Sequence, residues 1–100
     1  MSAGREEALE RLAALGPLRQ LAAELRAYPL RLLEQVITQA HARGGPVPDH
    51  LLRLDPFLGE ASLRALVEGG FLLRAPGDRA IYAYTPTDAG RALAAQAREG

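Results

Sequence analysis

The strongest constraint on the fold is a strand–turn–strand pattern near the C-terminus, enclosed between two helical segments. Residues 71–75 and 80–84 are rich in apolar, aromatic and β-branched side chains, and Pro76-Gly77-Asp78-Arg79 between them is typical of a tight turn. Since a two-stranded hairpin is not stable alone in water, it must pack against other elements. The sequence therefore predicts one β-hairpin that is supported by helices.

The second strand of this pattern runs directly into a helix start. Thr85 can accept a hydrogen bond from the free N–H groups of a first helical turn, and Pro86 already has the φ that the first helical position needs. Asp88, three residues after Thr85, completes a weak capping box. We expect the strand to end and a helix over residues 86–98 to begin within about one residue of Thr85.

The residues before the hairpin follow helical spacing that glycine and proline interrupt. Leucines recur at steps of three and four through the first 27 residues, and Gly16-Pro17 either starts a second helix there or kinks a single one. Further helices are expected over residues 29–43, 50–54 and 58–68. The predicted fold class is mostly α with a small β-hairpin. We divide it into an N-terminal helical arm, residues 1–27, and a domain, residues 28–100.

Composition excludes several classes of protein. Without cysteine, the 100 residues cannot form a disulfide framework, a thiolate metal site or a cysteine nucleophile. The net charge is zero, so no global field attracts nucleic acid or anionic lipid, and all twelve basic residues are arginine. The charged residues 1–14 do not resemble a signal peptide, and every apolar run is too short to span a bilayer. We expect a soluble, cytoplasmic protein.

The sequence gives little sign of catalysis or metal binding. His41 and His50 are nine residues apart, and Asp49 beside His50 does not complete a recognised metal spacing. No Ser-His-Asp set, phosphate-binding loop or pair of carboxylates in an apolar setting is present in the sequence. We therefore predict no enzyme activity, no catalytic residues, no metal and no cofactor.

Residues 61–93 resemble the winged helix-turn-helix regulators of the PadR and MarR type. Eight residues fall on the pattern of that group: Leu63, Leu66, Gly70, Phe71, Tyr84, Thr85, Gly90 and Leu93. The resemblance is close over about a third of the chain and looser from Leu30 onward. It implies a winged helix-turn-helix with an N-terminal helical arm. Residues 58–68 would then face the major groove of DNA, and residues 76–79 would form the tip of the wing.

The resemblance implies a DNA-binding transcriptional regulator, with contacts from Ser62, Arg64, Arg74 and Arg79. With Leu63, Leu66 and Val67 in the core, the exposed positions of the recognition helix would be Glu60, Ala61, Arg64, Ala65 and Glu68. Two carboxylates against one arginine are a poor match to phosphates. An alternative therefore stays open, in which the winged helix is a protein–protein interaction module that does not bind DNA.

The N-terminal leucines predict a contact with a second copy of the chain. A helical arm must bury its apolar stripe on its own domain or on a partner, and two-fold pairing suits two half-sites on DNA. We expect a homodimer, with packing within one chain as the alternative. The predicted dimer contact comprises Leu9, Leu12, Leu18, Leu21 and Leu25.

Overall fold

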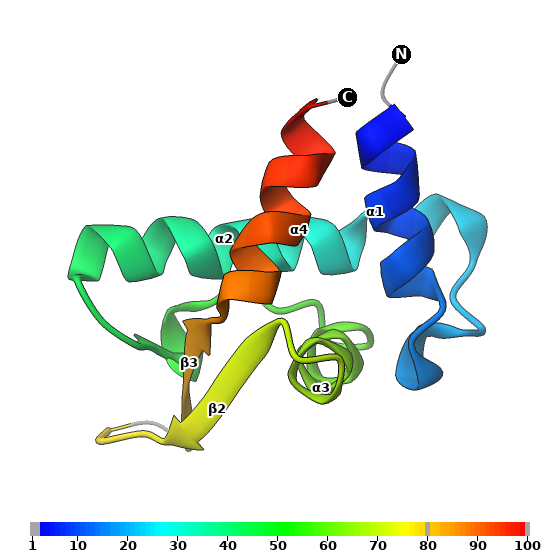
Figure 1. The fold of residues 1–100 in the computed structure, drawn as a ribbon. Coiled ribbons are helices and arrows are strands. Elements are labelled where there is room, and N and C mark those ends of the chain that lie inside the picture. Colours follow the sequence, from blue (N-terminus) through cyan, green and yellow to red (C-terminus); the bar gives the residue numbers. More distant parts are fainter. Residues whose placement is uncertain (1–2, 80, 100) are drawn as a thin grey trace.

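The computed structural model describes residues 3–79 and 81–99, which form four α-helices and a small antiparallel sheet (Figure 1). The helices are α1 (Ala3–Ala13), α2 (Tyr28–Arg43), α3 (Gly59–Glu68) and α4 (Asp88–Glu99). The strands are β1 (Val47–Pro48), β2 (Leu72–Pro76) and β3 (Tyr82–Pro86). Three short 3-10 helices are η1 (Gly16–Leu18), η2 (Ala23–Leu25) and η3 (Asp49–Leu51). The expected mostly helical fold with little strand is confirmed.

The sheet has three strands in the order β1-β3-β2, and not the two strands of the expected hairpin. β2 and β3 form the hairpin, in which Arg74 lies opposite Tyr84. β1 adds a short third strand through the pair Val47 and Tyr84. The sequence predicted a loop here, because Val47 between Pro46 and Pro48 shows no alternation. Val47 is fully buried, so its contribution to the core explains why the strand forms.

The start of α4 lies two residues later than expected. β3 continues through Pro86, which pairs with Leu72 of β2. β1 pairs only with Ala83 and Tyr84, so no bond to β1 is lost because Pro86 has no N–H. Thr87, and not Thr85, caps the helix, since its hydroxyl accepts a hydrogen bond from Gly90 N at 3.0 Å. The same hydroxyl donates to the carbonyl of Gly70 at 2.6 Å. The start of α4 is thereby fixed to the turn that precedes β2.

Of the helices predicted before the hairpin, α2 and α3 are confirmed, and the others differ from the prediction. α2 ends at Gly44, whose φ of 71° is in the left-handed region and whose N–H donates to Ala40 O at 2.9 Å. Asp55 accepts hydrogen bonds from the N–H groups of Phe57 and Leu58 just before α3. The helix expected over residues 50–54 is only the 3-10 turn η3.

The first 27 residues form one helix and two 3-10 turns, and they are not a separate arm. α1 lies beside α4 in Figure 1, and the N-terminal end of α1 and the C-terminal end of α4 are on the same side of the molecule. Leu9 and Leu12 belong to the same hydrophobic core as Leu93 and Ala97 of α4. Hydrogen bonds from Arg11 to Gln96 and from Gln96 to Glu7 join the two helices at the surface. α1 is therefore part of the domain that was expected to begin at residue 28.

The path after α1 is set by packing. Pro17 has no backbone N–H to donate, and the chain forms η1 there, against α3. Leu18 is buried in this contact region. Tertiary packing thus replaces the helix that leucine spacing predicted to continue or restart at Gly16-Pro17. Within the described residues, no helix is both long enough and apolar enough to cross a membrane.

Candidate nucleic-acid interface

A groove of about 260 Å³ lies between α3 and the β2–β3 hairpin, and we call it the helix–hairpin groove. α3 contributes Glu60 and Arg64 to its lining, β2 contributes Arg74, and β3 contributes Tyr82 and Tyr84. Side chains on one face of a strand recur at every second residue, so Tyr82 and Tyr84 share a face of the sheet with Arg74. Two of the predicted contact residues, Arg64 and Arg74, are therefore brought to one surface.

Arg74 is held in place by the aromatic side chains of the opposite strand. Its guanidinium lies 4.4 Å from the centroid of the Tyr82 ring, a cation–π contact worth about 0.5–1 kcal/mol at an exposed site. Its cross-strand neighbour Tyr84 is buried, and burial raises the pKa of the Tyr84 phenol above its ordinary value of 10.0. The positive charge of Arg74 acts in the opposite direction on that pKa. Tyr84 is therefore a neutral hydrogen-bonding group at neutral pH.

Asp49 ties the hairpin to the rest of the domain. One of its carboxylate oxygens accepts a hydrogen bond from the backbone N–H of Tyr82 at 3.1 Å. This bond connects η3 to the first residue of β3, across 33 positions of sequence. The sequence did not single out Asp49 or Tyr82 for these roles, because neither follows from local spacing. The bond fixes the turn end of the hairpin to η3.

Ser62 does not face the groove, which corrects its predicted role in DNA contact. Its side chain is 0% exposed, and Ala65, also expected at the surface, is fully buried. The reason is that α3 packs against α2, β2 and η1, so it buries a wider stripe than one helix face. The large exposed side chains of α3 are Glu60, Arg64 and Glu68.

Arg79 lies in the turn of the hairpin and does not line the helix–hairpin groove. Its side chain is exposed, as is that of Asp78 before it. A hydrogen bond of 3.2 Å from Gly77 N to Ile81 O closes the turn. The structure thus places Arg79 where the sequence predicted, at the tip of the hairpin, with an acidic neighbour.

The predicted dimer contact is wrong for three of its five leucines. Leu9, Leu12 and Leu18 are buried within a single chain, because α1 packs on α4 and η1 packs on α3. Leu21 is half-buried, and Leu25 is 38% exposed. The sequence could not separate these cases, since burial on the same chain and on a partner require the same leucine spacing.

The histidines do not form a metal site with Asp49. In the part of the chain that the structure describes, no three His, Asp or Glu side chains lie close enough together to hold a metal ion.

Comparisons with known proteins give no independent assignment. No family model matches the chain, and neither a curated protein nor a solved structure matches it. The functional argument therefore rests on the geometry of the described residues.

Proposed function

We propose that the protein is a winged helix-turn-helix protein that binds duplex DNA and regulates transcription. The observation that carries the proposal is the placement of Arg64 and Arg74 on one groove, with Arg79 at the exposed hairpin tip. The chain order α2, β1, η3, α3, β2, β3 and the sheet order β1-β3-β2 support this fold. In it, α3 is the recognition helix and the β2–β3 hairpin is the wing.

The three arginines have different roles in this proposal. Arg74 and Arg79 contact phosphates or enter the minor groove beside the wing, which positions the protein without reading sequence. Arg64 is exposed on α3 and meets base edges, where arginine pairs best with guanine. Glu60, one helical turn before Arg64, has the acceptor oxygens that suit the amino group of cytosine.

The acidic residues set the expected strength of binding. Glu60 and Glu68 repel phosphates, so only a few arginines neutralise the backbone. Two or three phosphate contacts give a slope of log affinity against log salt of about −2 to −3, since each contributes about −0.9. We therefore expect modest affinity that falls with salt.

Fluorescence anisotropy with a pool of labelled genomic duplexes at several salt concentrations tests this proposal. Arg79→Ala should weaken binding to all sequences similarly and make the slope shallower by about one unit. Arg64→Ala should instead reduce the preference for particular bases. Arg31→Ala is the matched control, because Arg31 is exposed on α2 and lines a different groove. Unchanged affinity and slope for both Arg64→Ala and Arg79→Ala would refute the assignment.

A protein-interaction module is the second candidate, and two exposed apolar side chains favour it. Phe57, just before α3, is 90% exposed, and Ile81 on the hairpin is 76% exposed. Large apolar groups on this surface suit a protein partner better than phosphates. A mixed-charge protein interface responds weakly to salt, so the same titrations separate the candidates. Pull-downs from native lysate with and without nuclease then show whether a partner binds directly.

The homodimer stays a prediction within this proposal. Two copies would place two recognition helices on two half-sites of DNA. Their contact cannot rest on Leu9, Leu12 or Leu18, which are buried within each chain. Sedimentation equilibrium at tens of micromolar, an order-of-magnitude concentration above typical oligomer dissociation constants, decides between monomer and dimer.

A further inference from the structure

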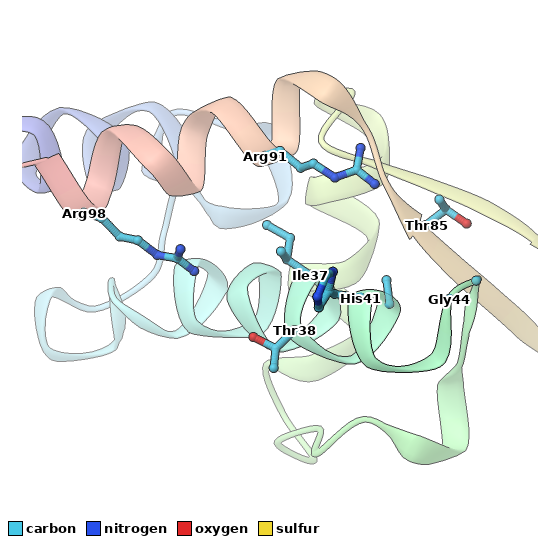
Figure 2. Close-up of a pocket in the computed structure, with 9 residues that line it drawn as sticks. Ile37, Thr38, His41, Gly44, Thr85, Arg91 and Arg98 are labelled. Carbon is cyan, nitrogen blue, oxygen red and sulfur yellow. The ribbon is translucent and has the colours of Figure 1, made fainter.

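A second groove lies between α2 and α4 and reaches β3, and we call it the α2–α4 groove (Figure 2). Its volume is about 630 Å³, within the range of small-molecule sites, which is roughly 300–1,000 Å³. Ile37 and Ala40 of α2 give it an apolar wall, and both are packed against the hydrophobic core. The groove is thus large enough for a small organic ligand and has an apolar surface for the ligand's body.

The α2–α4 groove concentrates positive charge in a chain whose net charge is zero. Arg91 and Arg98 of α4 line it, and no carboxylate does. The helix–hairpin groove differs, because Asp49 and Glu60 there balance Arg64 and Arg74. Arginines that line a groove without a carboxylate in its lining, beside an apolar wall, favour an anionic ligand over a neutral one or a cation.

The ion pair that Arg91 forms with Asp88 is weak. Asp88 lies 3.5 Å from Arg91, three residues earlier on the same helix, and both side chains are exposed. Exposed pairs of this kind contribute little free energy, so an incoming anion can replace Asp88 at small cost. Among the described residues, Arg98 has no hydrogen-bond or ion-pair partner.

Arg91 and Arg98 lie at different ends of the groove. They are seven residues apart on α4, which is about two helical turns and about 10 Å along the axis. In Figure 2, Arg91 extends toward the end at Thr85, whereas Arg98 extends toward α2 on the side of Thr38. His41 lies between them on the facing helix. Each end of the groove therefore offers one guanidinium.

We propose that the α2–α4 groove binds an elongated small-molecule dianion, with two carboxylate or phosphate groups joined by a short apolar spacer. One anionic group pairs with Arg91 near Thr85, and the other pairs with Arg98 near Thr38. The spacer lies along Ile37 and Ala40, beside His41. The proposal does not depend on DNA binding, since none of these residues lines the helix–hairpin groove.

The test is a titration of ¹⁵N-labelled protein, followed by amide chemical shifts, with linear dicarboxylates from succinate to suberate. Saturable shifts at α2, α4 and Thr85, with an optimum at one chain length, are expected. Adipate should bind about tenfold or more tightly than hexanoate, because hexanoate loses one arginine contact. Alkyl bisphosphates of matched length show whether the groove prefers phosphate to carboxylate.

Variants assign the binding to the two arginines. Arg91→Gln and Arg98→Gln should each weaken adipate binding about tenfold, since each removes one charge-assisted contact. Arg31→Gln, an exposed arginine of α2 that lines another groove, should leave the affinity unchanged. Equal affinity for adipate and hexanoate, or retention of affinity in both arginine variants, would overturn the proposal. Shifts of the same amides on dilution without ligand would also overturn it, because a second copy of the chain would then occupy the groove.

Discussion

Ser62 is a buried residue whose hydroxyl makes no hydrogen bond with its surroundings. Its side chain is 0% exposed, and its hydroxyl has no hydrogen-bond partner among the described residues. A buried unsatisfied polar group costs about 1–3 kcal/mol, and alanine also has the higher helix propensity. Ser62→Ala should therefore raise the free energy of unfolding by about 1 kcal/mol, measured by urea denaturation followed by circular dichroism. If the protein binds DNA as proposed, Ser62→Ala should leave that affinity unchanged, and a loss of affinity in a folded Ser62→Ala protein would restore the predicted contact.

Gly90 is required in α4 because of a close approach between backbones. A Cβ at this position would overlap the carbonyl oxygen of Phe71 and lie 3.1 Å from its carbonyl carbon. Both groups are backbone, so no side-chain rotation relieves the clash. Gly90→Ala should lower the free energy of unfolding by about 1–2 kcal/mol, despite a gain of about 1 kcal/mol in helix propensity.

Gly16→Ala is the matched control for that change. A Cβ at Gly16 would have no atom within 4 Å, and its φ is not positive. We expect an unchanged or slightly higher urea midpoint, because alanine restricts the unfolded chain. Equal midpoints for Gly90→Ala and Gly16→Ala would show that α4 can move away from Phe71.

At the scale of elements, Thr87 connects the start of α4 to the turn before β2. Its hydroxyl caps Gly90 N and donates to Gly70 O, so one side chain joins two elements. Loss of an N-cap costs about 0.5–2 kcal/mol, and here the carbonyl of Gly70 also loses its hydrogen-bond donor. Thr87→Ala should lower the free energy of unfolding by about 1–2 kcal/mol in thermal or urea unfolding. Thr87→Ser keeps the hydroxyl and should stay near the parent protein. If Thr85→Ala is the more damaging change, the cap has been assigned to the wrong threonine.

Elements with a strong local pattern were predictable from sequence, and elements formed by distant contacts were not. Apolar spacing and the Gly44-Gly45 and Gly69-Gly70 stops gave α2 and α3, and the turn at residues 76–79 gave the hairpin. β1 exists because Val47 packs into a sheet whose other strands come much later in the chain. The same limit applies to the candidate site. The sequence predicted exposed positions for Arg64 and Arg74, which line one groove, whereas the burial of Ser62 depends on three elements around α3.

At the scale of the whole molecule, α1 and α4 close one core that includes both ends of the described chain. The core joins Leu9 and Leu12 of α1 to Leu93 and Ala97 of α4, and through them to α2 and the sheet. A helix with these contacts is expected to unfold together with the rest of the domain. The α2–α4 groove depends on this arrangement, because α1 packs against both α4 and α2 and so helps to fix how α4 lies on α2.

The burial of Leu12 allows a test of whether the N-terminal leucines stabilise a single chain or a contact with a second copy. Leu12 is fully buried, whereas Leu25 is 38% exposed. Leu12→Ala should lower the free energy of unfolding by about 2–5 kcal/mol, and Leu25→Ala should lower it by less than about 1 kcal/mol. Because the neighbours of Leu12 come from its own chain, the difference between Leu12→Ala and the parent should persist when the protein is diluted tenfold. If Leu12 instead contacted a second copy, dilution would remove that contact from the parent protein. The difference in unfolding free energy between the parent and Leu12→Ala would then become smaller. Urea unfolding at two protein concentrations, with sedimentation equilibrium on the same samples, separates these outcomes.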